Sequence, residues 1–464
     1  MKKLALSDEI LMQIEKPARY IGNELNSVVK ENTSQIRFAM CFPDVYEIGM
    51  SHLGIQILYD MFNRREDTWC ERVYSPWPDL HKVMKEQNIP LFGLESQEPI
   101  KNFDFIGITL QYEMCYTNIL QILDLAQIPL RAKDRSDEDP IVLGGGPCTY
   151  NPEPIADFFD CFYIGEGETQ YDTFLNLYKK MKEEGNYTRQ SFLHEAAKIE
   201  GIYVPQLYEV DYKEDGTIAS FTPACEDIPT TIKKQVDMDL TGSVYPEKPV
   251  VPFIKATQDR VVLEIQRGCI RGCRFCQAGM IYRPNREKDV ERLKELARSM
   301  IAATGHEEIS LSSLSSSDYS QLEELINFLI DECGKKKINI SLPSLRIDAF
   351  SLDIMQKVQE GKAVISVRQW KGRPYEKGNV QVELFRLGKD DGVGLQTLSV
   401  MEYTDADDGI ERAVYCIDGK PMPMLTLKQI AENDGLTVED WKAWFTGITF
   451  DKPLPIIHFT KFRY

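Results

Sequence analysis

The chain has 464 residues, 43% hydrophobic and 27% charged, which is the composition of an ordinary globular protein of about three domains. It contains no run of about 18 apolar residues, so we expect no membrane span, and its net charge of −18 argues against general attraction to nucleic acid. The N-terminus lacks the apolar stretch of a signal peptide, and the 11 cysteines are scattered except for one tight group, so we expect a cytoplasmic protein.

The first part of the chain alternates short apolar runs with helical patterns. Residues 51–64 have helical spacing, with Ser51 as the expected N-cap. Strands that alternate with helices form βαβ units and a mostly parallel sheet, so we predict a Rossmann-like domain over residues 1–245. The predicted buried strands lie at residues 36–42, 103–110, 141–146 and 160–165.

The same rhythm returns from Arg260, after a hairpin expected at 201–223 with its turn at Asp215-Gly216. A helix that Gly305 closes follows the first strand. We predict a partial (βα) barrel over residues 246–360. Its three strand–helix units are 261–269 with 289–305, 307–314 with 321–334, and 338–347 with 351–361.

After Gly361 the strand–helix alternation stops. A T-x-x-D signal from Thr437 to Asp440 opens the second of two short helices, at 426–433 and 437–445. The other patterns alternate like strands, so we predict a small β-rich domain over residues 361–464. Its strands are expected at residues 363–370, 379–387, 395–403, 411–418 and 453–462.

The tight cysteine group is C-x3-C-x2-C, formed by Cys269, Cys273 and Cys276 directly after a predicted strand. Three thiolates can hold three irons of a 4Fe-4S cluster, and the open fourth iron can chelate the amino and carboxylate groups of a methionine moiety. Gly268 lets the loop wrap closely around an inorganic core, and Phe275 can shield one cluster face. The alternatives are a structural zinc site, which normally needs a fourth ligand that is not found nearby, and three incidental cysteines.

This spacing, with a phenylalanine before the third cysteine, resembles the radical S-adenosylmethionine (SAM) superfamily. The stretches EIQRGCIRGCRFCQAGMIYRP, EEISLSSLSSSDYSQLEELI and ISLPSLRID resemble one uncharacterised family within it, whose members carry an N-terminal domain like a cobalamin-binding domain. EKPARYIGNELNSV, FPDVYEIGMSHLGIQILY and LGGGPCTYNPEPIADFFDCFYIGEGE fit the same family, so the resemblance covers residues 1–360.

The resemblance implies a 4Fe-4S cluster at the three cysteines, bound SAM, and a reductant partner such as flavodoxin or ferredoxin. The reduced cluster would cleave SAM to a 5′-deoxyadenosyl radical, which takes a hydrogen atom from a substrate that the sequence does not name. Ser312, Ser313 and Ser315 occupy the position where superfamily members hold the methionine amino group, and Arg346 could pair with its carboxylate. The alternatives are a serine-rich turn that caps the next helix and a surface salt bridge.

Glycine loops follow two predicted strands, at 144–146 and 165–168, where ligands bind in open parallel sheets. Cobalamin domains that supply a histidine to cobalt carry Asp-x-His-x-x-Gly, but no histidine stands two residues after Asp44. We therefore expect no cobalamin, and we place His52 near a helix start rather than at a cobalt ion.

Residues 361–464 resemble phage-type ASCH domains with a PUA-like β-barrel, which implies RNA or nucleotide binding. The alternative is an exposed charged hairpin. This domain stands where further barrel strands are expected, so the activity of the chain is in question. We predict a radical SAM protein, the alternative being an inactive fused remnant whose β domain binds RNA or nucleotides. The residues suited to a phosphate and a stacked base are Arg368, Lys371, Arg373 and Lys377, with Trp370 and Tyr375 between them.

Overall fold

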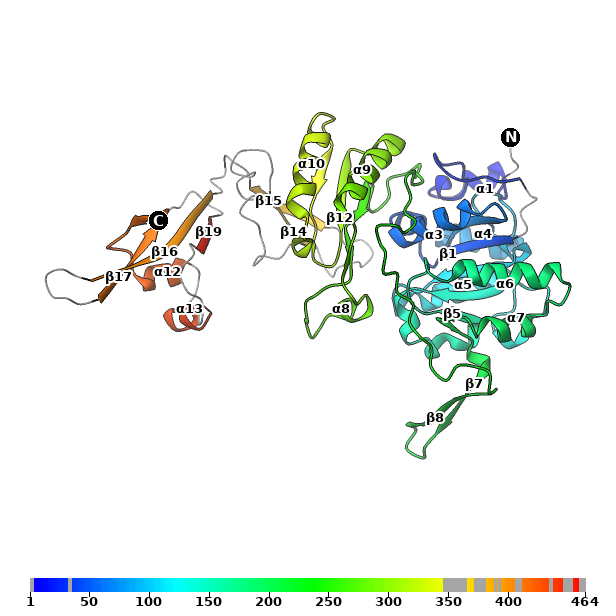
Figure 1. Cartoon of the computed structure of the whole chain (residues 1–464). Coiled ribbons are helices and arrows are strands. Elements are labelled where there is room, and N and C mark those ends of the chain that lie inside the picture. The colour runs from blue at the N-terminus through cyan, green and yellow to red at the C-terminus, as the bar shows by residue number, and fades with distance from the viewer. Residues whose placement is uncertain are drawn as a thin grey trace. The chain divides into compact units, whose positions relative to one another are not determined.

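The computed structural model of the chain divides into two compact units, Met1–Ser344 and Leu345–Tyr464 (Figure 1). The expected domain boundary at 360/361, the helix expected at 351–361 and Arg346 lie outside the described residues. No helix in the described part of the chain is long and apolar enough to cross a membrane. The structure describes residues 4–31, 36–344, 365–370, 381–387, 390, 394–404, 411–433, 437–444 and 454–458.

The first unit begins with a six-stranded sheet in the order β2-β1-β3-β4-β5-β6. The first five strands in this order are parallel, and β6 pairs antiparallel with β5. The predicted α/β class is confirmed. The strands are β1 (Ile36–Phe42), β2 (Thr68–Tyr74), β3 (Phe105–Thr109), β4 (Ile141–Gly145), β5 (Cys161–Tyr163) and β6 (Ile202–Tyr203).

Helices flank this sheet, so every residue of β1, β2 and β3 is buried (Figure 1). The edge strand β2 is covered on its open side by the N-terminal segment and a loop. There the Arg72 guanidinium pairs with Glu24 at 2.8 Å and with Glu95 at 2.6 Å. The helices are α3 (Leu53–Arg64), α4 (Pro78–Gln87), α5 (Tyr116–Leu125), α6 (Tyr171–Glu183) and α7 (Arg189–Ala196).

The N-cap of α3 differs from the predicted one. His52 takes this place, and its Nδ1 accepts a hydrogen bond from the Ile55 N–H at 3.2 Å. The Ser51 hydroxyl donates instead to the Glu47 carbonyl at 2.8 Å, in the preceding turn. The predicted Ser51 cap is therefore wrong, because the hydroxyl already has a partner one turn earlier.

The barrel segment of the first unit has a parallel sheet in the order β13-β12-β9. The strands are β9 (Val261–Glu264), β12 (Glu308–Ser312) and β13 (Asn339–Ser341), and the helices between them are α9 (Val290–Thr304) and α10 (Leu322–Gly334). Gly305 ends α9 in the left-handed conformation, with φ of +70°, as predicted. The predicted hairpin is also confirmed, as β7 (Tyr208–Tyr212) and β8 (Ile218–Pro223).

The second unit is rich in β-strands, as predicted. The Thr437 start signal is confirmed, because the Asp440 N–H donates to the Thr437 hydroxyl at 3.1 Å. The ASCH-like identity of this region stays a prediction, and Lys371, Arg373, Tyr375 and Lys377 lie outside the described residues. The elements are β14 (Ile365–Trp370), β15 (Gln381–Leu387), β16 (Gly394–Thr404), β17 (Glu411–Ile417), β18 (Lys420–Pro421), β19 (Leu454–His458), α12 (Leu427–Asn433) and α13 (Val438–Trp444).

Candidate cofactor and substrate site

A cavity of about 380 Å³ opens where the strands of the N-terminal sheet end. The strand order reverses direction between β1 and β3, and ligands of open parallel sheets bind outside the carboxyl ends of strands at such a switch point. Met40 of β1, Thr109 of β3 and Gly145 of β4 line this end of the cavity. Glu264 and Ser312 line it from the barrel segment, so two parallel sheets contribute to one site.

The Gly165–Glu168 loop forms part of the cavity wall and is held by backbone contacts. Gly165 has φ of +121°, and a Cβ atom there would fall 2.2 Å from the Gln235 carbonyl oxygen. The Glu166 N–H donates to that same carbonyl at 3.0 Å. Only glycine allows this approach, which sets the direction of the two glutamates that follow.

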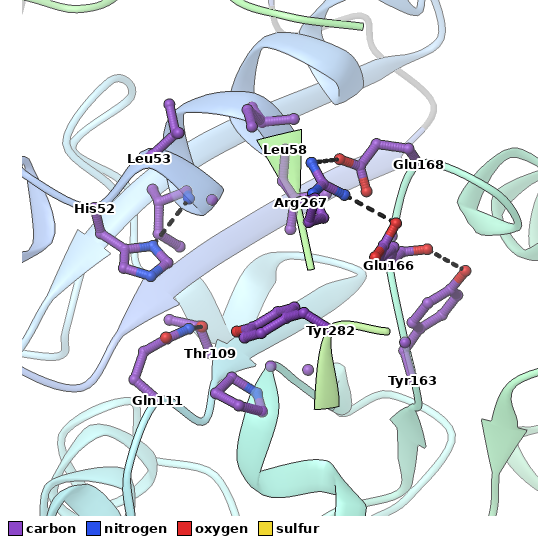
Figure 2. Close-up of a pocket in the computed structure, with 18 of the residues that line it drawn as sticks. His52, Leu53, Leu58, Thr109, Gln111, Tyr163, Glu166, Glu168, Arg267 and Tyr282 are labelled. Carbon is purple, nitrogen blue, oxygen red and sulfur yellow. Dashed lines mark hydrogen bonds and ion pairs between the residues drawn. The ribbon is translucent and has the colours of Figure 1, made fainter. Parts of the chain in front are cut away.

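These glutamates meet Arg267, which stands two residues before the first cysteine of the loop (Figure 2). The guanidinium of Arg267 lies 3.0 Å from Glu166, 2.9 Å from Glu168 and 2.8 Å from Glu264. Its side chain is only 12% exposed. Burial acts to lower the pKa of Arg267, but the three carboxylates, Glu264 foremost, outweigh it and raise that pKa above the ordinary value. Glu166 also forms an ion pair with Arg286, with an N–O distance of 2.7 Å.

The cysteine loop is clamped on both sides. At its start Gly268 has φ of +89°, and a Cβ there would fall 2.4 Å from the Pro284 carbonyl oxygen. On the other side, Arg271 forms a two-point ion pair with Asp318, with N–O distances of 3.0 and 2.5 Å. This pair ties the loop to the segment that follows β12.

The three cysteines present half-buried, unpaired thiols on this loop. The Arg271 N–H donates to Cys269 Sγ at 3.4 Å, and the Gly279 N–H donates to Cys276 Sγ at 3.3 Å. Such bonds stabilise thiolates, the form that binds metal. Three cysteines at this spacing, with one iron left open for another ligand, suit an iron–sulfur cluster, whereas a structural zinc site takes four protein ligands.

The serine-rich segment after β12 lies beside this loop. Ser312 and Ser313 line the cavity. Ser315 is 2% exposed, and its hydroxyl has no partner in the described part of the chain. Gln266, also 2% exposed, donates through Nε2 to the Ser315 carbonyl at 2.5 Å, while its Oε1 has no partner there. A buried polar atom without a hydrogen-bond partner is costly, so these two atoms are candidates to contact a ligand.

Two further residues of the cysteine loop, Arg274 and Phe275, are exposed. Phe275 is 92% exposed, so its predicted role as a shield for the cluster stays a prediction. Arg274 is exposed and forms no ion pair among the residues that the structure describes. Sequence reasoning missed Gln266 and Asp318. It also missed the pairing of Arg267 with the Glu166 and Glu168 carboxylates. The glycine–glutamate pattern at 165–168 was visible, but its partner lies about a hundred positions away, as the 99-residue separation from Glu168 to Arg267 shows.

His52 lines the same cavity, near Gln111 and Thr109 (Figure 2). Its Nδ1 is used as the cap of α3, which leaves the proton on Nε2. Burial lowers the pKa of His52 to about 4, so the ring is neutral at pH 7. The Gln111 amide donates to the Thr109 hydroxyl at 2.6 Å. This end of the cavity is therefore polar but uncharged.

A three-cysteine loop beside a cavity at parallel strand ends is the arrangement expected of a radical SAM protein, and the chain belongs to the radical SAM superfamily. The family model for the N-terminal domain of radical SAM proteins matches residues 54–205. The model for the radical SAM superfamily matches residues 263–368. The uncharacterized protein MJ0966 of Methanocaldococcus jannaschii is 28% identical over 330 residues, which is 68% of this chain. The chain spans 57% of the length of that relative.

Two solved radical SAM proteins also resemble the chain. The cobalamin-dependent SAM radical enzyme OxsB, with aqua-cobalamin and SAM bound, has a TM-score of 0.42 and 14% identity over 66% of this chain and 38% of its own. The radical SAM methyltransferase TsrM of Kitasatospora setae, with cobalamin and a 4Fe-4S cluster bound, has a TM-score of 0.39 and 12% identity over 66% of this chain and 54% of its own.

Proposed function

We propose that the chain is a radical SAM protein in which Cys269, Cys273 and Cys276 bind a 4Fe-4S cluster. The observation that carries this proposal is the clamped loop with three half-buried thiols beside a cavity. When bound, the reduced cluster and SAM supply a 5′-deoxyadenosyl radical that can take a hydrogen atom from a substrate. An external reductant such as flavodoxin or ferredoxin supplies the electron.

The residues around the loop would hold the methionine end of SAM. Gln266 Oε1 and the Ser315 hydroxyl are buried acceptors that suit its ammonium group. Ser312 and Ser313 add hydroxyl groups at the cavity wall. We keep Arg346 as the partner of the carboxylate, by its position after the third barrel strand.

The substrate would occupy the cavity at the sheet end. Tyr163, Tyr171 and Tyr282 give this space an aromatic lining, and the carboxylates of its wall are neutralised by Arg267 and Arg286. A cavity with an aromatic lining limits the access of water, which would protect a reactive radical. The substrate itself is not identified by these contacts.

Cobalamin is not part of the proposed function. A histidine ligand to cobalt would have to come from His52, whose Nδ1 caps α3 and whose position follows the Asp44 segment by eight residues rather than two. Equilibrium dialysis with hydroxocobalamin should detect no tight binding. A submicromolar dissociation constant would contradict this expectation.

The test of the cluster is anaerobic reconstitution with iron and sulfide. The protein should bind about four irons and four sulfides per chain. After reduction, SAM should change the electron paramagnetic resonance spectrum of the cluster. A colourless protein that binds zinc in place of iron, and loses that zinc when Cys273 is replaced by Ala, would overturn the proposal in favour of a zinc site at the loop.

A further inference from the structure

A thiol, an imidazole and a carboxylate converge on the N-terminal domain, apart from the cavity described above. His194 belongs to α7, while Cys225 and Asp227 follow the hairpin strand β8 (Figure 1). One ligand atom from each of the three side chains lies within 4.8 Å of the other two. None of the three lines the cavity at the sheet end.

The backbone that presents these side chains is anchored on both sides. The Ala224 N–H donates to the Leu207 carbonyl at 2.8 Å, and the Ile228 N–H donates to the Cys225 carbonyl at 3.3 Å. Ile228 is 3% exposed and belongs to the main hydrophobic core. On α7, Phe192, two residues before His194, is fully buried. The three donors therefore converge because the fold holds their backbones in place.

The carboxylate of this group already pairs with a cation of the protein. Asp227 Oδ2 lies 2.9 Å from the Lys198 ammonium and 2.9 Å from His194 Nε2. The hydrogen bonds from Lys198 and from His194 lower the pKa of Asp227 to about 2, so the carboxylate is ionised at pH 7. His194 is 29% exposed and Asp227 is 53% exposed, so an ion can reach them from solvent.

The thiol makes this group more than a surface ion pair. Cys225 is the one exposed cysteine of the chain, since seven others are buried and the three of the cluster loop are half-buried. A nitrogen, a sulfur and an oxygen donor together suit zinc, whereas calcium and magnesium prefer oxygen donors alone. Three protein ligands leave a fourth position for water.

We propose that His194, Cys225 and Asp227 bind a divalent transition-metal ion, with Zn²⁺ as the best match. The Lys198 ammonium pairs with Asp227 in the free protein and would compete with the metal for that carboxylate. Binding releases the Cys225 thiol proton, because the thiolate is the ligand. The bound metal would join α7 to the segment after the β7–β8 hairpin. This proposal does not depend on the proposed radical SAM function.

The experiment uses the full-length chain with Cys269, Cys273 and Cys276 replaced by Ser, so that the cluster loop cannot bind zinc. Calorimetric titration with Zn²⁺ should show one ion per chain, with a dissociation constant of about 1 μM or lower. Cys225→Ala should weaken binding by more than about tenfold. Lys198→Gln should instead tighten binding severalfold, because it removes the competing cation without removing a ligand.

Co²⁺ gives a second readout. It should produce a thiolate-to-cobalt absorption band that Cys225→Ala abolishes and Lys198→Gln retains. If the triple serine variant is misfolded by circular dichroism, zinc is counted instead in cluster-loaded protein with and without His194→Gln. Absence of binding, or binding that is equal in the parent and the Cys225→Ala protein, would overturn the proposal.

Discussion

The N-terminal sheet and the barrel segment are both built from parallel strands joined by helices, yet the cysteines within the sheet and those of the barrel segment's cysteine loop differ in burial. Cys41, Cys70 and Cys161 lie within strands and are fully buried, and burial raises the pKa of each thiol. The three cysteines of the loop before α8 (Ala278–Ile281) follow a strand and are half-buried. A strand interior turns a thiol into an inert apolar group, whereas a glycine loop after the strand keeps it available to metal.

The most direct test of this difference is to remove one thiol from the cysteine loop and one from the sheet. Cys273→Ala should lose the cluster, because two thiolates cannot hold it, and reconstituted iron should fall well below the full load. Cys41→Ala should keep about four irons per chain and lower the free energy of unfolding by about 1 kcal/mol. Iron analysis and urea denaturation measure the two effects. Full iron in the Cys273→Ala protein would show that the loop does not bind the cluster.

A second test concerns the length of the barrel. The loop needs only local structure, but the nucleoside end of SAM needs contacts from later strands, which we expect the β-rich domain to replace. Misplacement by about 1 Å can cost about a hundredfold in rate, so 5′-deoxyadenosine formation should be at least about a hundredfold slower than in a control chain. The control replaces the residues after Glu360 with the barrel of a full-length relative. Equal rates would mean that the β-rich domain completes the site.

The third test compares two arginines near the cysteine loop. Arg267→Gln leaves three nearly buried carboxylates without their shared partner and should lower the free energy of unfolding by about 3 kcal/mol. Arg274→Gln, at an exposed position, should change it by less than about 0.5 kcal/mol. Adding Glu168→Gln to Arg267→Gln should restore part of the loss, since one uncompensated charge is removed. Equal effects of the two arginine substitutions would contradict the role of the pairing.

The smallest expected effect concerns acid stability. The pKa of His52 is about 4 in the folded chain, below its ordinary value near 6.5, because burial disfavours the charged ring. Between these two values the unfolded chain binds the proton more readily, so the free energy of unfolding falls by about 2.5 kcal/mol as the pH falls from 6.5 to 4. His52→Asn keeps a capping side chain but cannot titrate. The free energy of unfolding of the His52→Asn protein should fall less over this pH range than that of the parent. A pH profile identical to the parent's would contradict the low pKa of His52.

Local patterns predicted much of the fold. The apolar run at 36–42 is β1, Gly305 ends α9, and Thr437 opens α13, because each depends on neighbouring residues only. The predicted Ser51 cap was wrong because Ser51 and His52 are both polar and adjacent in the sequence. The Ser51 hydroxyl bonds to the preceding turn, so His52 caps the helix.

The sequence by itself determined the class of the protein. Cys269, Cys273 and Cys276 stand within a few residues of one another after a strand, and this spacing alone predicts the cluster site. Only the tertiary structure decided what surrounds that loop. Arg267 meets Glu166 and Glu168 of the loop after β5, and Gln266 meets Ser315 of the segment after β12. Local patterns report periodicity and turns, whereas pairing across about a hundred residues depends on how parallel sheets bring their strand ends together.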